Sequence, residues 1–413
     1  MKIWLTEIGE CYPFQVGSSP IRTGHLASAL ESRGHDIVWW GANFYHHKKE
    51  FLFDKYTEVQ VNPHYQIRLL EGLGYQKNVS FRRYCHHKIV ARNFRIQASR
   101  EIDRPDIIVS SLPNYELNYE AVRLGQAWNI PVIVDVMDLW PDDFLNHLPK
   151  ALRGLARLAL SYDFYLTRRS LRLADGIVSV SDGFLDWALK YANRKKEDRD
   201  HTYYIGFSRK ELSKDYQPRP EFEQTIKKLA GKMIFAFIGS FGQSYDLELV
   251  VAVAKKMMDQ GREDIHFVLA GTGEKFDKVL RESTRNVTLT GWLNEDEMTH
   301  LLSVSHVGLV PCWHMQDAVT TKPMQYLARG LPLLSSLRGE MEAIIDENEI
   351  GLSYPPGDIS SFHSAILRFA DDPMMREKYS SNALKIFHEK FDADAIYPAY
   401  IDHIESVVKM GRR

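Results

Sequence analysis

The 413-residue sequence contains little cysteine: three residues, Cys11, Cys85 and Cys312, stand far apart in the chain. No CxxC pair occurs, so neither a disulfide framework nor a zinc site is predicted, and a reducing compartment fits. An excess of charge of one sign is missing as well. Lysine and arginine (52) nearly balance aspartate and glutamate (54), and the formal net charge of −2 argues against a nucleic-acid-binding protein.

Long hydrophobic runs are also absent from the sequence. No stretch approaches the roughly 20 apolar residues of a membrane span, and the opening residues MKIWLTEIGE turn acidic too early for a signal peptide. We therefore expect a cytoplasmic protein, with any contact to the inner face of the membrane peripheral. The apolar content of 44% and charged content of 26% are typical of a globular protein, and the length allows two domains.

Short apolar segments alternate with helical patterns along the whole chain, and this alternation predicts an α/β fold with parallel sheets. The predicted strands are residues 3–8, 36–41, 106–111, 131–136, 174–181, 203–205, 233–239, 265–270, 287–289, 308–311, 332–334 and 351–356. Residues 44–76 are poorly periodic and are expected to hold a short strand and surface loops. A segment rich in Lys, Pro and Glu suggests domains at residues 1–206 and 224–390, a linker at 207–223 and a C-terminal helix at 391–413.

One stretch, MQDAVTTKPMQYLARGLPLLS, organises the second half of the chain. A buried strand precedes it, Thr320 and Thr321 can cap a helix, and Gly330 can close that helix. Doubly wound folds present helix N-termini to ligands in this way.

Three polar residues in this stretch suit a phosphorylated sugar: Asp317 can accept from hydroxyls, Lys322 supplies a cation, and Gln325 supplies an amide. The alternative is an ordinary βαβ turn with polar surface residues.

Asp317, seven intervening residues, Gln325 and then YLARGLP resemble the donor-site signature of retaining, metal-independent glycosyltransferases of the GT-B fold, family 4. That signature has a glutamate at both ends. Asp317 is one methylene shorter than the expected residue, and Gln325 keeps the size of a glutamate but loses its charge.

Other motifs of this family occur in order along the chain. The opening βαβ unit matches at Gly17, Leu26, Ala27, Leu30, Arg33, Gly34 and His35, and the second half matches at Gly239, Gly242, Gly271, Gly273 and Gly291. Many relatives bind the diphosphate through an Arg and a Lys, where this chain has Ser240 and Tyr245. The segment DLWPD from Asp138 to Asp142 resembles members that build bacterial surface polysaccharides such as lipopolysaccharide.

The resemblance implies a GT-B fold, in which two Rossmann-like domains face a cleft and the C-terminal helix crosses back to the first domain. It implies transfer of a hexose from a nucleotide diphosphate sugar, UDP- or GDP-linked, to a hydroxyl of a lipid-linked glycan. Retention of the anomeric configuration, and a reaction without metal or other cofactor, are implied too. Asp142-Asp143 is expected to start a helix rather than to form a metal-binding DxD motif.

The resemblance also assigns roles to residues. Asp317 and Lys322 are the catalytic candidates, orienting the sugar and stabilising the leaving group respectively. The donor-binding candidates are Gly17, Ser240, Gly271, Gly273, Trp292, Leu293, Thr320, Thr321 and Gln325, with Gln325 placed on the ribose. Asp138 and Ser18 are the acceptor-binding candidates.

Two basic stretches with interleaved apolar residues, one from Lys77 to Arg104 and one from Lys150 to Arg172, have amphipathic helical patterns. They predict peripheral docking on anionic lipid, to which each basic residue contributes roughly 1 kcal/mol. The alternative is two ordinary solvated helix faces.

Two other functions remain open from the sequence. A sugar-nucleotide 2-epimerase shares the GT-B architecture but needs acid and base groups around the sugar. A catalytically weak sugar-binding subunit would fit the missing Arg and Lys and the Gln325 substitution.

Overall fold

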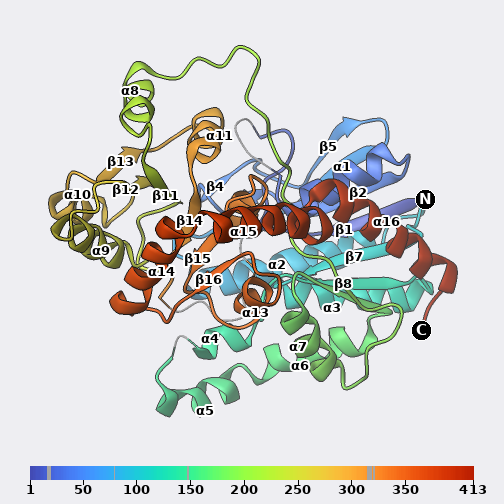
Figure 1. Cartoon of the computed structure of the whole chain (residues 1–413). Helices are drawn as coiled ribbons and strands as arrows, with labels where there is room; N and C mark the ends of the chain where they lie inside the picture. The colour runs from blue at the N-terminus through green and yellow to red at the C-terminus, as the bar shows by residue number, and fades with distance from the viewer. Residues whose placement is uncertain (16–19, 79, 147, 314–318, 320) are drawn as a thin grey trace. The chain divides into compact units, whose positions relative to one another are not determined.

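The structure is a computed structural model that describes residues 1–15, 20–78, 80–146, 148–313, 319 and 321–413 (Figure 1). The chain forms two compact units. Unit 1 comprises Met1–Tyr204 and Ile396–Arg413, and unit 2 comprises Ile205–Ala395. Each unit has its own sheet with helices packed on it, which confirms the predicted α/β class.

Unit 1 contains an eight-stranded sheet of order β10-β9-β8-β7-β1-β2-β6-β5, parallel except for the antiparallel edge strand β5. Its elements are β1 (Lys2–Thr6), α1 (Arg22–Ser32), β2 (Asp36–Ala42), β3 (Phe44–Tyr45), β4 (Glu50–Phe51), β5 (Thr57–Asn62), β6 (Tyr65–Leu70), α2 (Phe81–Ala98), β7 (Ile107–Leu112), α3 (Tyr115–Trp128), β8 (Val132–Val136), α4 (Asp142–Asn146), α5 (Lys150–Ala159), α6 (Ser161–Leu173), β9 (Gly176–Ser179), α7 (Asp182–Ala192), β10 (His201–Thr202) and most of α16 (Ala393–Met410). The central strands are buried on both faces, as continuous apolar runs predict.

Unit 2 contains six parallel strands in the order β13-β12-β11-β14-β15-β16. Its elements are α8 (Pro220–Lys228), β11 (Met233–Ile238), α9 (Leu247–Asp259), β12 (Ile265–Ala270), α10 (Phe276–Glu282), β13 (Val287–Gly291), α11 (Glu295–Val304), β14 (Val307–Val310), α12 (Thr321–Leu327), β15 (Leu333–Ser335), α13 (Glu340–Glu347), β16 (Gly351–Ser353), α14 (Ile359–Asp371), α15 (Pro373–Ile386) and a π-helical turn, Phe387–Phe391. All six residues of β11 are buried.

The strand order reverses direction at β1 in unit 1 and at β11 in unit 2. The next strand in the chain lies on one side of each, and a later strand lies on the other. Ligands of doubly wound sheets bind beyond the carboxyl ends of the strands at such a point. The ends of β1 and β11 are therefore the places where the fold favours a site.

Three sequence-based predictions of secondary structure were wrong. Residues 203–205 lie outside the sheet, and the last strand is the short β10 just before them. Residues 44–76 contain four strands, of which β6 is buried beside β2. The stretch from Lys150 to Arg172 is two helices, α5 and α6, that meet at Leu160.

A buried ion pair connects α1, β8 and α16 within unit 1. Arg22 Nε donates to Asp135 Oδ2 at 2.7 Å, and the Tyr400 hydroxyl donates to the same oxygen at 3.1 Å. Arg22 Nη1 also donates to the carbonyl oxygen of Tyr203 at 2.7 Å. The pair therefore fixes both the end of β10 and the C-terminal helix to the sheet.

Candidate functional site

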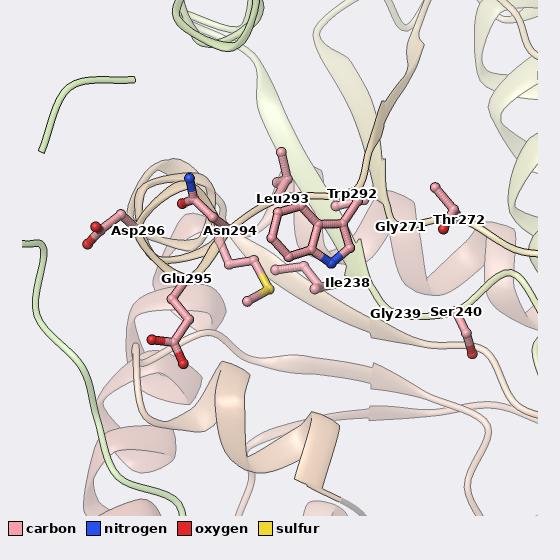
Figure 2. A pocket seen from close by; sticks show the side chains of 12 residues that line it. Ile238, Gly239, Ser240, Gly271, Thr272, Trp292, Leu293, Asn294, Glu295 and Asp296 are labelled. Carbon is pink, nitrogen blue, oxygen red and sulfur yellow. The ribbon is translucent and has the colours of Figure 1, made fainter. Parts of the chain in front are cut away.

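A cavity of about 670 Å³ lies at the carboxyl ends of β11, β12 and β13, where the topology of unit 2 favours a ligand (Figure 2). Its lining residues come from the loops after these strands and from the first turns of α11. They are Ile238, Gly239, Ser240, Ala270, Gly271, Thr272, Trp292, Leu293, Asn294, Glu295, Asp296 and Met298.

Two glycines allow the loops to meet at the cavity floor. Gly271 has φ +136°, and a Cβ on it would overlap the carbonyl oxygen of Gly239. A Cβ on Gly239 would in turn overlap the amine of Lys322. Larger residues at these positions would push the loops apart, so the glycines bring the backbone close to the cavity.

Lys322, in the first turn of α12, places its amine beside the end of β11. The amine donates to the carbonyl oxygen of Ile238 and lies 4.5 Å from the ring centre of Phe237 and 4.8 Å from that of Tyr245. Burial lowers its pKa to about 8. Within the described part of the chain, no carboxylate forms an ion pair with Lys322. An anionic ligand in the neighbouring cavity would supply that charge.

Tyr245 stands where the family resemblance implies a lysine. Its ring centre lies 4.8 Å from the amine of Lys322. The negative face of an aromatic ring attracts a cation. Tyr245 therefore helps to position Lys322.

Trp292 presents a large aromatic surface to the cavity. Its side chain is 68% exposed, whereas the next residue, Leu293, is buried in the protein. Figure 2 shows the indole in the middle of the lining residues, with Ser240 and Thr272 on one side and Asn294, Glu295 and Asp296 on the other. An exposed indole beside a hydroxyl-lined loop can stack on a planar ring such as a nucleobase.

The structure brings four of the predicted donor residues to the cavity wall: Ser240, Gly271, Trp292 and Leu293. Gly273 is not among the lining residues, and a Cβ on it would come within 2.8 Å of the Phe241 carbonyl oxygen.

Apart from Asp138, two of the remaining predicted residues are described by the structure and four are not. Gln325 is half-buried, and its Nε2 lies 4.0 Å from the sulfur of Met298, which lines the cavity. Thr321 is the exposed first residue of α12. Gly17, Ser18, Asp317 and Thr320 lie outside the described residues.

Several cavity residues were not predicted, among them Glu295, Asp296 and Met298. Asn294 and Glu297 form a capping box at the start of α11, and acidic residues in a first helical turn usually have this stabilising role. In this structure Glu295 also pairs with Lys210 at 2.6 Å, and Ser213 donates to Asp296. The sequence pattern predicted where α11 begins. It did not predict that the start of this helix lines the cavity.

Asp138, the acceptor candidate, follows β8 in unit 1 and reaches solvent. Partial burial of its carboxyl and the nearby charge of Asp143 raise its pKa to about 6. Asp142, four residues further along the DLWPD segment, begins α4 and accepts hydrogen bonds from Trp187 Nε1 at 3.0 Å and from the Tyr191 hydroxyl. Asp142 therefore anchors this segment to α7.

At the end of β1, unit 1 has a carboxylate where unit 2 has its cavity. Glu10 accepts from the backbone N–H groups of Thr23 and Gly24 in the first turn of α1, at 2.9 and 3.1 Å. Burial raises its pKa, and the buried Glu7 lies nearby. Glu10 thus occupies the position that an anionic ligand would take at this helix start. No motif in the sequence marks Glu10 for this role.

Comparisons with known proteins point to one family. Residues 232–372 match the family described as glycosyl transferases group 1. The O-antigen chain mannosyltransferase C of Escherichia coli is 22% identical over 281 residues, which cover 64% of this chain and 72% of that protein. The alpha-D-kanosaminyltransferase of Streptomyces kanamyceticus is 21% identical over 277 residues, 66% of this chain and 69% of that protein.

Solved structures similar to the whole chain show its fold. Sucrose-phosphate synthase from Thermosynechococcus elongatus has a TM-score of 0.70 at 16% identity, with 99% of this chain and 100% of that chain covered. The Anabaena protein HepE in complex with UDP has a TM-score of 0.66 at 11% identity, with 98% and 99% covered. Residues 232–372 are therefore similar to the glycosyl transferases group 1 family, and the chain has the GT-B fold of these solved structures.

Proposed function

We propose that the protein transfers a hexose-type sugar from a nucleotide diphosphate sugar to a hydroxyl of a lipid-linked glycan. The reaction would retain the anomeric configuration and need no metal, and it would serve the synthesis of a bacterial surface polysaccharide. The observation that carries the proposal is the half-buried cation Lys322 beside a cavity that is lined by glycine loops and an exposed indole. A nucleotide diphosphate sugar offers the matching anion, planar base and hydroxyl groups.

Each part of the donor has a proposed partner. The base stacks on Trp292, and the diphosphate lies at the loop of Gly239 and Ser240, beside Lys322. Gln325 binds the ribose and Asp317 orients the sugar hydroxyls, as the family resemblance implies. The solved complex of HepE with UDP supports a uridine nucleotide as the first donor to test.

In the proposed reaction, the bond between the anomeric carbon and the diphosphate oxygen breaks while the acceptor hydroxyl forms the new glycosidic bond. The leaving phosphate takes the proton of that hydroxyl, and the nucleoside diphosphate departs. Lys322 stabilises the negative charge that grows on the leaving oxygen, which is the step where a positioned cation lowers the barrier most. Asp138 positions the acceptor.

The acceptor class rests on relatives and on sequence. The E. coli relative is an O-antigen chain mannosyltransferase, and the DLWPD segment resembles surface-polysaccharide members. Among the described residues, no helix combines the length and the apolar content needed to cross a bilayer. A lipid-linked acceptor would therefore be met by peripheral docking. The match to group 1 glycosyltransferases favours transfer over the epimerase alternative.

The first test is a thermal-shift panel with UDP, GDP, dTDP, ADP and CMP on the wild type and Asp317→Ala. A ligand at 100 times its dissociation constant stabilises the folded state by about 2.7 kcal/mol. One diphosphate is expected to stand out, and Asp317→Ala should lose only the additional shift given by the intact sugar nucleotide. No shift with any nucleotide in a folded sample would contradict the donor site.

Product analysis then tests the chemistry. Turnover in excess EDTA tests metal independence, and the NMR coupling constant of the new anomeric proton tests retention. Sugar conversion without an acceptor would instead indicate an epimerase. Nucleotide binding without any transfer would indicate a sugar-binding subunit.

A further inference from the structure

Helix α5 has an apolar face that the rest of unit 1 leaves uncovered. Leu152, Leu155 and Leu158 recur at three-residue spacing on one side of the helix, and they are 51%, 70% and 71% exposed. All ten residues of α5 are described, and none of them is buried. A surface helix of a globular protein normally turns such a face toward the core.

The opposite, basic face of α5 makes the contacts with the protein. Arg153 donates to the carbonyl oxygens of Leu148 and Asn146 at 3.1 and 3.3 Å. The guanidinium of Arg157 lies 3.6 Å from Asp142 and 4.5 Å from the ring centre of Phe164. The leucines of α5 therefore point outward, while Arg153 is half-buried and Arg157 contacts unit 1 but stays 55% exposed, at the edge of unit 1 beside α4 and α6 (Figure 1).

The exposed side of the adjacent helix α6 carries aromatic and basic residues. Tyr162 and Tyr165 are 56% and 49% exposed, and Arg168, Arg169 and Arg172 are exposed as well. The stretch from Lys150 to Leu173 has six basic residues and one acidic residue. That acidic residue, Asp163, is buried and accepts a hydrogen bond from the Tyr84 hydroxyl.

Helix α2, in the other basic stretch, does not share this arrangement. Its apolar residues Val90 and Phe94 are fully buried in the core of unit 1, and Phe81, the first residue of the helix, is 80% exposed. The part of α2 from Val90 onward thus packs in the core, whereas the leucines of α5 do not.

We propose that the outward faces of α5 and α6, the α5–α6 surface, lie flat on an anionic lipid bilayer. The leucines enter the boundary between headgroups and acyl chains, the tyrosines lie at headgroup depth, and the arginines of α6 contact lipid phosphates. A second copy of the chain is a poorer occupant, because two such surfaces would bring their positive charges together. A bilayer matches both the apolar stripe and the positive charge.

This proposal deepens the proposed function and rests on its lipid-linked acceptor. Helix α5 follows the DLWPD segment directly, and Arg157 connects it to Asp142 of that segment. Docking of the α5–α6 surface would therefore hold Asp138, the acceptor candidate, close to the membrane that carries the acceptor.

Vesicle flotation tests the surface without donor or turnover. Wild type is expected to float with phosphatidylcholine vesicles containing phosphatidylglycerol, and much less with phosphatidylcholine alone. The double variant Leu155→Glu/Leu158→Glu should bind at least about tenfold more weakly. Arg168→Gln/Arg169→Gln should weaken binding and reduce its salt dependence. The matched control is Ile102→Glu, at a 96% exposed residue of unit 1 outside this surface, and it should bind like the wild type.

Three results would overturn the proposal: absence of wild-type binding to anionic vesicles, equal binding by the leucine variant, or equal loss in the Ile102→Glu control. Size-exclusion chromatography adds a fourth, a wild-type dimer that becomes monomeric in the leucine variant. The nucleotide thermal shift of the same variants checks their folding. It also separates the two proposals, because the donor site can bind nucleotide whether or not the surface binds lipid.

Discussion

Each unit contains a cation near the point where the strand order of its sheet reverses: the buried Arg22 in unit 1 and the half-buried Lys322 in unit 2. The charges of the two cations are balanced differently. In unit 1, the side chains of Arg22 and its partner Asp135 are 1% and 3% exposed. Burial acts to lower the pKa of Arg22, but the charge of Asp135 outweighs this effect and raises it. In unit 2, Lys322 contacts a carbonyl oxygen and two aromatic rings, and burial lowers its pKa to about 8.

The two cations differ in the partner that balances their charge. A buried charge is costly unless a partner of opposite sign is close. Asp135 is that partner for Arg22, so the charge is balanced within unit 1. For Lys322, the described residues provide no carboxylate in ion-pair contact, and the glycine loop beside it lines a cavity. Of the two cations, only Arg22 has a carboxylate among the described residues that balances its charge.

The largest expected effect comes from breaking the balanced pair. Asp135→Ala leaves Arg22 buried without its partner, and we expect the free energy of unfolding to fall by about 3–5 kcal/mol. Urea denaturation measures this loss. The control is Asp402→Ala, which removes the exposed partner of Arg33 and should cost less than about 1 kcal/mol. Equal losses in both variants would refute the structural role of the buried pair.

Removal of the other cation should affect catalysis rather than folding. In Lys322→Met we expect kcat/KM for sugar transfer to fall about 10²–10³-fold, because the leaving group loses its stabilising charge. The thermal midpoint should stay at or above that of the wild type, since a costly buried charge is gone. Lys378→Met, at a surface ion pair of unit 2, is the control. A large fall in stability with little change in transfer would place Lys322 among the structural cations.

Substitution of Trp292 distinguishes binding of the nucleobase from binding of the diphosphate. Trp292→Ala should weaken nucleotide binding by about 1–3 kcal/mol through loss of stacking, and Trp292→Phe should restore part of it. Isothermal titration with UDP and with inorganic diphosphate measures both contributions. The expected loss appears with UDP and not with diphosphate. A similar loss with both ligands would mean that the indole supports the loop instead.

The pH dependence of binding should follow the protonation of Lys322. Its pKa of about 8 means that the amine is charged at pH 7 and loses its proton as the pH rises through 8. Binding of a diphosphate needs the charged amine, so affinity for UDP should fall between pH 7 and 9, by at most about tenfold per pH unit. Titrations at several pH values measure the slope. The slope should be absent in Lys322→Met, and its persistence would assign the proton to another group.

Most strands and helices could be predicted from local patterns. How they pair and which way they face could be predicted much less. The buried runs of β8 and β11 and the helix α3 follow directly from apolar content and period, because local burial decides these elements. Strand β6 was missed, since polar residues interrupt its sequence and its place beside β2 depends on distant pairing. The orientation of α5 could not be predicted either: the period shows two faces, and tertiary contacts alone decide which of them points outward.

In the candidate site, too, some residues could be predicted from sequence patterns, but their contacts with distant segments could not. Lys322 was singled out from its place at a predicted helix start, and Gly271 and Gly273 from their match to a family motif. The rings of Phe237 and Tyr245 beside the lysine, and the contact of Glu10 with α1, depend on packing between distant segments. The roles of Asp317 and Gln325, the metal independence and the retention of configuration stay predictions.

The C-terminal part of α16 imposes an order on the synthesis of the protein. Residues 396–413 belong to unit 1, where Tyr400 donates to Asp135 and the backbone of Arg413 donates to Asp175 at 2.6 Å. A ribosome completes all of unit 2 before it makes these residues. While unit 2 is made and can fold, the Arg22–Asp135 pair of unit 1 therefore lacks its contact with Tyr400. Unit 1 is made first, but it completes its contacts with residues 396–413 last.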